Sequence, residues 1–206
     1  MRFNNPLNHI LDSKAKIICL RLLCNSPTDI NGRQLSKIVK LSPTTVHKAM
    51  KELAYEQVVL LNNYGNSHVY ELNKRNKIVA EILKPLFDQE KKLFSNFIEI
   101  ILKRIKAFKF RNKIISIVLF GSVHARTENP RSDIDVCVVV KEQKDLKGVE
   151  ELLFDINFET MPSIGMGLQP YLKTLNEFKK DKNLKVVKSI LKSNKLIWGE
   201  RLEKMK

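Results

Sequence analysis

Apolar residues recur with helical spacing in the first third of the chain. Residues 13–24 indicate a helix with Asp12 or Ser13 as its N-cap. The segment RQLSKIVKL predicts a second, short helix. A third begins in SPTTVHKAMKEL, with Ser42 as N-cap and Pro43 as its first residue. Its spacing predicts a buried stripe at Val46, Ala49, Met50 and Leu53.

The pattern then changes twice before the middle of the chain. VVLLNNYGNSHVYEL contains two strand-like runs around an Asn- and Gly-rich turn and predicts a β-hairpin. Residues 73–108 form a long helical pattern, which Pro85 is expected to kink or break. This helix is either an amphipathic connector or a surface that pairs with a second subunit. Its predicted apolar stripe is Val79, Ile82, Leu86, Leu93, Phe97, Ile101 and Ile105.

Strand-like and helical segments alternate after Lys113. IISIVLF, SDIDVCVVV and IGMGLQPYLKT are predicted strands, and a helical segment around residues 150–158 precedes the third. A helix at residues 182–193 leads to KLIWGE, a terminal strand expected to place Trp198 in the core. This order predicts an α+β or α/β fold whose mixed sheet is covered by helices.

Composition narrows the partners and the compartment. The chain of 206 residues is long enough for one large domain or two small ones. Its formal charge of +15 favours polyanions such as nucleic acid, nucleotides or acidic membrane surfaces. A lysine-rich solvated surface is the alternative. Cys19, Cys24 and Cys137 lie in apolar segments without C-x-x-C spacing, which predicts buried thiols in a reducing compartment. We find no signal peptide or membrane span and expect a cytoplasmic protein without a membrane partner.

The segment LFGSVHARTENPRSDIDVCVVV has the spacing G-S-x10-D-x-D. Side chains at i and i+2 of a strand point to the same face, so Asp133 and Asp135 would present neighbouring carboxylates. Such a pair repels itself unless a cation lies between the two groups. Mg²⁺ commonly takes one or two carboxylates together with substrate phosphates. The spacing therefore predicts a site for Mg²⁺ bound to a nucleoside triphosphate.

Other residues of this segment fit a triphosphate. Gly121 has no Cβ, so a phosphate can approach the backbone closely. If a helix opens at Ser122, its hydroxyl and the free amides there would bind phosphate oxygens. Arg126 and Arg131 would neutralise the remaining charge. The alternative is that Ser132 and Asp133 only cap a turn. We expect the loop residue His124 to be solvated, with substrate contact as the alternative, and Cys137 to be a core residue rather than a nucleophile.

Two resemblances extend this interpretation. The motif resembles that of the DNA polymerase beta-type nucleotidyltransferases, in particular their minimal branch, over residues 114–199. The three helices and hairpin resemble a winged helix-turn-helix domain, and a winged helix fused ahead of a minimal nucleotidyltransferase is a layout found mainly in archaeal and bacterial proteins. The layout implies a DNA-binding domain at residues 1–73, a helical connector at 74–110 and a nucleotidyltransferase-like domain at 111–206.

The resemblance assigns roles to single residues. Gly121 and Ser122 fall on the phosphate-binding pair, and Asp133 and Asp135 on the first two catalytic, metal-binding carboxylates. Active members take a third carboxylate from a neighbouring strand, which is expected to be IGMGLQPYLKT. None of the residues on its polar face is acidic: Gly165, Gly167, Gln169 and Tyr171. Asp155 or Glu159 would substitute only if LLFDINFE were a strand.

The winged-helix resemblance implies contacts with double-stranded DNA. The wing tip, residues 63–68, would reach the DNA backbone or minor groove. A winged helix that contacts another protein is the alternative. The expected groove-facing set on the third helix is Thr44, Thr45, His47, Lys48 and Lys51.

Two functions follow from these patterns. The first is an enzyme, a nucleotidyltransferase that moves a nucleoside monophosphate from a Mg²⁺–triphosphate to a hydroxyl acceptor and is coupled to DNA binding. The second is a DNA-binding transcriptional regulator, or an antitoxin-like protein, whose C-terminal domain binds nucleotide or a partner without turnover. A homodimer through the long helix is compatible with both.

Overall fold

The computed structural model describes residues 2–26, 28–64 and 67–205. The chain forms two compact units, Met1–Leu93 and Phe94–Lys206, and the boundary falls inside the long helix α5 (Lys84–Ala107). The helical connector expected at residues 74–110 is therefore shared between the two units. In the part of the chain that the structure describes, no helix is long and apolar enough to cross a membrane.

The N-terminal unit contains the three predicted helices and the predicted hairpin. Strands β2 and β3 pair antiparallel, and β3 also pairs with the short β1. The four-residue helix α1 and the two-residue strand β1 were not predicted, because segments this short show no period. The elements are α1 (Leu7–Ile10), α2 (Lys14–Asn25), β1 (Ile30–Asn31), α3 (Gly32–Val39), α4 (Pro43–Tyr55), β2 (Val59–Tyr64) and β3 (Ser67–Leu72).

Capping side chains fix where these helices begin. Ser13, rather than Asp12, caps α2 and accepts a hydrogen bond from the amide of Lys16. Ser42 caps α4 and accepts from the amide of Thr45, and Pro43 is the first helical residue. The stripe predicted on α4 is buried in full, from Val46 to Leu53. Hydrogen bonds between residues close in the sequence therefore determine where α2 and α4 begin.

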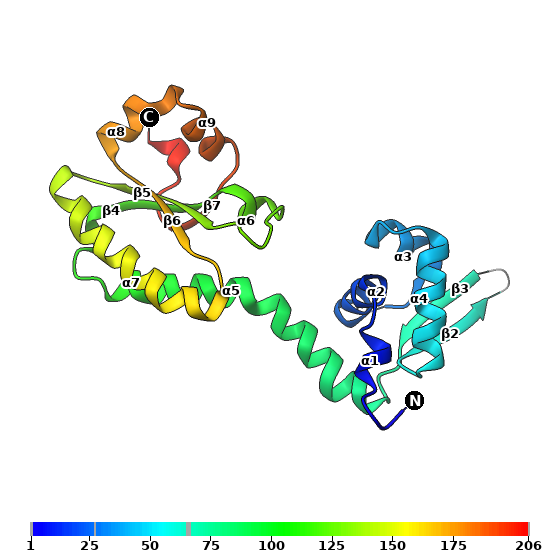
Figure 1. Cartoon of the computed structure of the whole chain (residues 1–206). Helices are drawn as coiled ribbons and strands as arrows, with labels where there is room; N and C mark the ends of the chain where they lie inside the picture. Colours follow the sequence, from blue (N-terminus) through cyan, green and yellow to red (C-terminus); the bar gives the residue numbers. More distant parts are fainter. Residues whose placement is uncertain (1, 27, 65–66, 206) are drawn as a thin grey trace. The chain divides into compact units, whose positions relative to one another are not determined.

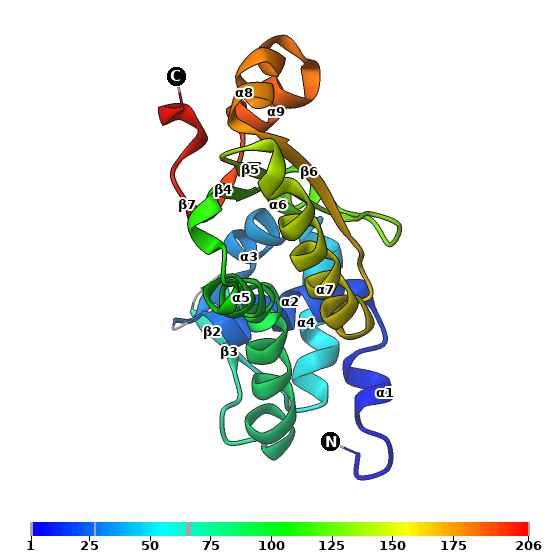
Figure 2. The same cartoon turned by 90° about the vertical axis from the view of Figure 1, so that its left-hand side faces the viewer.

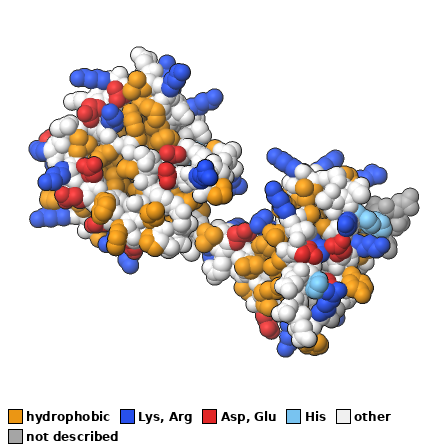
Figure 3. Space-filling view, in the orientation of Figure 1, with side chains coloured by type: hydrophobic (Ala, Val, Ile, Leu, Met, Phe, Trp, Pro, Cys, Tyr) orange, Lys and Arg blue, Asp and Glu red, His pale blue; other side chains and the backbone are white. Residues whose placement is uncertain are grey.

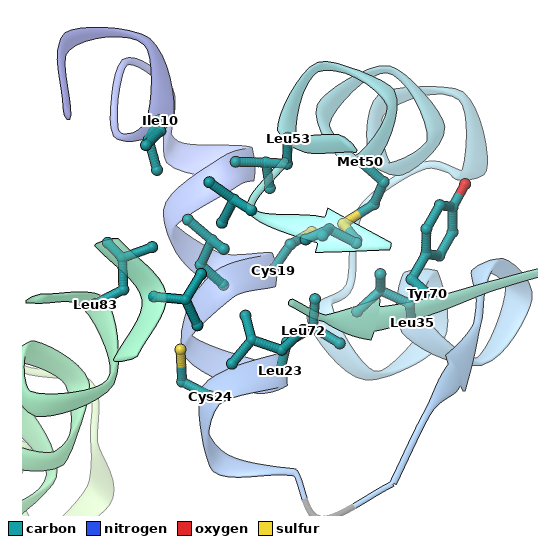
Figure 4. Close-up of a cluster of buried hydrophobic side chains, with 14 of the residues drawn as sticks. Ile10, Cys19, Leu23, Cys24, Leu35, Met50, Leu53, Tyr70, Leu72 and Leu83 are labelled. Atoms are coloured by element: carbon teal, nitrogen blue, oxygen red, sulfur yellow. The ribbon is translucent and has the colours of Figure 1, made fainter. Parts of the chain in front are cut away.

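One hydrophobic cluster holds the N-terminal unit together. Residues from all its helices and from β2 and β3 meet there, and Figure 4 shows Cys19 and Cys24 inside the cluster. Both thiols are free and buried, as predicted, and burial raises the pKa of each to about 11. Tyr70 lies at the edge of the cluster, with its hydroxyl group pointing outward in Figure 4.

The long helix departs from its predicted stripe. A π-helical turn, Val79–Leu83, precedes α5, and the amide of Lys84 bonds to the carbonyl of Val79, five residues back. Pro85 follows as the second residue of α5 and lacks an amide to continue the usual ladder. The extra residue in that turn shifts the buried positions by one. Leu83 and Phe87 are buried instead of Ile82 and Leu86, and Phe97, Ile101 and Ile105 are buried as predicted.

The C-terminal unit is built on a four-stranded mixed sheet. The strand order is β6-β5-β4-β7, in which β5 and β6 are parallel and the other pairs are antiparallel. The predicted strands and the predicted mixed sheet are confirmed. Helix α8 was not predicted. The main elements are β4 (Ile114–Leu119), α6 (Gly121–Ala125), β5 (Ile134–Val140), α7 (Leu146–Ile164), β6 (Leu168–Thr174), α8 (Leu175–Lys180), α9 (Lys185–Lys192) and β7 (Lys195–Gly199).

Helices cover both faces of this sheet. On one face, Ile134, Val136 and Val138 of β5 pack with α7 and the last turns of α5. On the other, Cys137 and Val139 pack with α8 and α9. Figures 1 and 2 show α7 and α8–α9 on opposite sides of the strands. Trp198 of β7 is only partly buried, which corrects its predicted place in the core, because β7 is an edge strand.

Candidate functional site

The turn between β4 and α6 brings Gly121 directly against Asp135. Gly121 is the first residue of α6 and has a positive φ of 74°. The amide of Phe120, one residue earlier, donates to the carbonyl of Asp135 at 3.0 Å. A Cβ placed on Gly121 would collide with the Asp135 carboxylate. Because residue 121 has no side chain, the Asp135 carboxylate can occupy this position.

If the predicted nucleotide site is present, Gly121→Ala should weaken its binding of Mg²⁺–ATP strongly. The substitution adds backbone strain at a positive φ, and its methyl group must displace the Asp135 carboxylate. A loss of about 10-fold to 100-fold is expected, as when the partner of a metal ligand is removed. Isothermal calorimetry with Mg²⁺–ATP measures it. Gly165→Ala also has a positive φ but an open Cβ position, so it controls for strain alone. If both variants lost the same affinity for Mg²⁺–ATP, the loss would not come from a collision between residue 121 and Asp135.

The two aspartates lie next to each other at the start of β5. Asp135 is the second residue of the strand, and Asp133 precedes it. Burial raises the pKa of Asp135, and the negative charge of Asp133 raises it further. Asp135 shares its sheet face with Cys137, which is fully buried deeper along the strand. Burial raises the pKa of Cys137 to about 12, so this thiol is a core residue, as predicted.

The remaining residues predicted to contact phosphate lie on α6 and in the loop between α6 and β5. Ser122 is the second residue of α6, so a helix does open at this position. Arg126 ends α6 in a left-handed conformation, and both Arg126 and Arg131 are exposed. Within residues 2–26, 28–64 and 67–205, no ion pair holds either guanidinium group. Ser132 accepts a hydrogen bond from the amide of Asn129 and so does cap a turn.

Strand β6 supplies the neighbour of Asp135 but no acid. Gln169 is in parallel register with Asp135, so both side chains point to the same face. A Cβ on Gly167 would lie 3.2 Å from Asp133 Oδ1, so this glycine leaves room for the second aspartate. Gly165 and Gly167 both precede the strand, contrary to the predicted alternation, because Gly165 ends α7 as a left-handed C-cap and β6 begins only at Leu168.

Asp155 and Glu159, the two acids considered as substitutes for the third carboxylate, lie away from Asp135. LLFDINFE belongs to helix α7, which packs on the sheet face opposite to that of Asp135. Asp155 is exposed, and Glu159 forms an ion pair with Arg104. Neither can complete the site. Sequence reasoning missed Asn157, whose Oδ1 accepts from the amide of Leu168 at 2.7 Å and fixes the start of β6. No pattern in the sequence singles it out.

The carboxylates of Asp133 and Asp135 fit a hard cation whose other ligands come from phosphate and water. Within the described ranges, no group of three or more His, Cys, Asp or Glu residues could hold a metal ion. Two neighbouring carboxylates are, however, sufficient for Mg²⁺ when phosphate oxygens and water supply the other positions. Asp133 and Asp135 are the residues that would hold it.

The C-terminal part of the chain is similar to known proteins. Residues 103–202 match the family model "Polymerase beta, Nucleotidyltransferase". The C-terminal unit is thus similar to nucleotidyltransferases over these residues, and its mixed sheet is consistent with that fold. The comparison with curated proteins found no match.

Two solved structures are similar to about half of the chain. One is described as "Crystal structure of the toxin-antitoxin with AMP-PNP"; the match has 18% identity and a TM-score of 0.35 and covers 52% of this chain and 76% of the other. The second is a toxin–antitoxin MntA–HpeT mutant, with 16% identity and a TM-score of 0.34, covering 52% and 75%. Both likenesses are distant.

The residues predicted to contact DNA lie on the outer face of α4. Two of them also have partners within the protein: the hydroxyl of Thr45 lies 2.7 Å from Ser42 Oγ, and His47 Nδ1 lies 3.2 Å from the hydroxyl of Tyr70. Residues 65 and 66 of the predicted wing tip lie outside the described residues. All five predicted positions are exposed: Thr44, Thr45, His47, Lys48 and Lys51.

Proposed function

We propose that the C-terminal unit is a nucleotidyltransferase domain that binds a Mg²⁺–nucleoside triphosphate and transfers the nucleoside monophosphate to a hydroxyl acceptor. The contact between Gly121 and Asp135, with Asp133 beside it, carries this proposal. It brings a side-chain-free backbone position and two carboxylates to one place, which suits a phosphate and its cation. Bound Mg²⁺ would neutralise the phosphates for in-line attack.

The chain's own residues have separate roles in this proposal. Asp133 and Asp135 hold the cation and thereby orient the triphosphate. The hydroxyl of Ser122 donates to a phosphate oxygen. Arg126 and Arg131 lie on an exposed loop, so they are free to close on the outer phosphates.

Calorimetry with and without Mg²⁺ tests the binding step. Titration of ATP in Mg²⁺ buffer should release or absorb heat with a defined stoichiometry, and titration in EDTA should not. Equal affinity in both buffers would remove the metal-dependent site. Incubation of the protein with labelled triphosphate and cell extract then tests transfer, through a labelled acceptor.

A regulator without turnover is the second candidate function. The observation that favours it is Gln169, a neutral residue at the strand position beside Asp135. Under this second function, the chain is a DNA-binding transcriptional regulator or an antitoxin-like protein. Its C-terminal unit then binds nucleotide or a partner protein without transferring a group. It predicts Mg²⁺-dependent binding without a labelled product.

We also propose that the N-terminal unit binds double-stranded DNA through α4. The exposed lysines of this unit support this, and so does the formal net charge of +15 over the whole chain. Affinity for duplex DNA is expected to fall with salt by about 0.9 log units per log unit of salt for each phosphate contact. Fluorescence anisotropy over a salt series measures the slope.

Lys48→Gln should reduce that slope by about one contact. Lys14→Gln removes the same charge from α2 instead of α4 and serves as the matched control. A salt-independent affinity contradicts DNA binding. An unchanged slope in Lys48→Gln contradicts the assignment to α4.

A homodimer through the long helix is the last part of the proposal. Ile82, Leu86 and Leu93 are 42%, 47% and 66% exposed, and their spacing places them on one side of the helix. We expect the mass measured by light scattering to exceed that of one chain, and Leu86→Glu/Leu93→Glu to restore the single-chain mass. Phe3→Glu replaces an apolar residue that is even more exposed, at 93%, and should leave the mass unchanged. A wild-type protein of single-chain mass at all concentrations would contradict the dimer.

A further inference from the structure

The N-terminal unit contains a cavity that the proposed function does not use. It has a volume of about 520 Å³, and the first turns of α3 and α4 line it together with strand β3. We refer to it as the α3–α4 cavity. Small-molecule sites typically have volumes of about 300–1,000 Å³. The cavity is therefore large enough for a ligand bigger than a single ion.

The charges around the α3–α4 cavity favour an anion. Arg33 and Lys37 of α3 line it, together with the imidazoles of His47 and His68, and none of its lining residues in the described ranges is acidic. A guanidinium and an ammonium group next to each other match the oxygens of a phosphate. The surrounding side chains thus attract negative charge and offer several hydrogen-bond donors.

The backbone of α3 adds donors at the same place. In the capping box of this helix, Asn31 Oδ1 accepts from the amide of Gln34 at 2.8 Å. The amides of Gly32 and Arg33 are the other donors of that first turn, and both residues line the cavity. The positive end of the helix dipole favours an anion there as well.

The remaining walls are flat or apolar. The rings of His47 and His68 are 5.5 Å apart at an angle of 33°, and His47 is held by its contact with the Tyr70 hydroxyl. Pro43 and Val46 of α4 supply apolar surface. Figure 3 shows histidine side chains beside Lys and Arg side chains on this unit. Flat imidazole surfaces beside a cationic rim suit a heterocyclic ring attached to a phosphate.

We propose that the α3–α4 cavity binds a nucleoside monophosphate. The phosphate contacts Arg33, Lys37 and the first amides of α3, and the base lies against His47 and His68. This site is separate from the triphosphate site of the C-terminal unit and needs no metal. Because His47 also belongs to the proposed DNA-contacting face of α4, ligand and duplex should compete; this consequence rests on the proposed DNA binding.

The four histidines of the chain allow a direct test by proton NMR. AMP is added to the full-length protein in EDTA, so that a Mg²⁺-dependent triphosphate site is silent. The imidazole signals of His47 and His68 should shift, and those of His9 and His124 should not; single His→Gln variants assign them. Since His124 lies on α6 beside Ser122, its signal reports separately on the C-terminal unit when Mg²⁺–ATP is added.

Variants and competing ligands make the test decisive. Arg33→Gln should raise the dissociation constant for AMP by roughly tenfold or more, since a charge-assisted bond is lost. Lys14→Gln removes the same charge outside the cavity and should have no effect; both side chains are exposed, and the dispersion of the NMR spectrum checks folding. The proposal is overturned if all four histidine signals shift alike or if Arg33→Gln and Lys14→Gln bind AMP equally.

Two further ligands identify the source of the phosphate. Inorganic phosphate should bind at least about tenfold more weakly than AMP, because it lacks the stacked ring. Equal affinity overturns the nucleotide assignment. If duplex DNA shifts His47 and His68 and AMP does not, the cavity holds a phosphate of the DNA backbone and the proposal is wrong. AMP should also displace labelled duplex in the anisotropy assay, and undiminished duplex binding at saturating AMP would overturn the competition.

Discussion

Replacing both aspartates, Asp133→Asn with Asp135→Asn, is expected to abolish Mg²⁺-dependent nucleotide binding. Each amide keeps the shape of the carboxylate and removes the charge that a hard cation requires. Replacing only a supporting partner of a metal ligand costs about 10-fold to 100-fold, so the loss of both ligands should exceed roughly 100-fold. Calorimetric titration with Mg²⁺–ATP measures it.

The double variant should not lose stability, which separates a lost ligand from a lost fold. Burial and the charge of Asp133 raise the pKa of Asp135 in the folded state. The stability that a raised carboxyl pKa contributes is present below the unfolded pKa and is lost as pH rises through the folded pKa. Above that pH range the ionised form of Asp135 is therefore unfavourable in the free protein, and Asn should match or exceed the melting temperature of the wild type.

A control of equal charge change is available on α7. Glu151→Gln with Asp155→Asn also removes two exposed negative charges, on a helix that packs against the other sheet face. This variant should bind Mg²⁺–ATP like the wild type. If the control and the Asp133/Asp135 variant lose affinity equally, the effect is one of net charge and the proposed site is wrong.

Gln169→Asp is expected to create or increase nucleotidyl transfer. Residue 169 lies beside Asp135 in parallel register, and neighbouring strands are about 4.8 Å apart. A carboxylate there would add a ligand or a base that the resemblance to active nucleotidyltransferases requires. A positioned general base contributes about 10²–10⁴-fold in rate, and a gain of that order is expected in the labelled-triphosphate assay.

Gln169→Asn is the matched control, because it has the length of Asp without its charge. The gain should appear only with Asp, and only with Mg²⁺, since a third acid beside Asp135 increases repulsion without a cation. Equal transfer by Asp and Asn variants would show that residue 169 is not the position of the missing acid. Rapid transfer by the wild type would show that no third carboxylate is needed.

The pattern of the sequence predicted the secondary structure where a cap or a strong period was present. Ser13, Ser42 and Pro43 begin helices because their side chains act on backbone groups three residues away or less. The stripe predicted for the long helical segment was wrong at Ile82, Leu86 and Leu93. At the first two positions, the π turn before Pro85 adds a residue that the spacing cannot show. Helix α8 was missed because its six residues span less than two turns.

The chain order alone determined that a glycine–serine turn follows one strand and that two acids begin the next, since both depend on neighbours in the sequence. Only the tertiary structure decided that Gly121 lies against Asp135, that Gln169 stands beside it, and that Asp155 and Glu159 lie across the sheet. Strand order and helix packing make those contacts, and they join residues as far apart as Asp135 and Gln169, which are separated by 34 positions (169 − 135), beyond the reach of any local pattern.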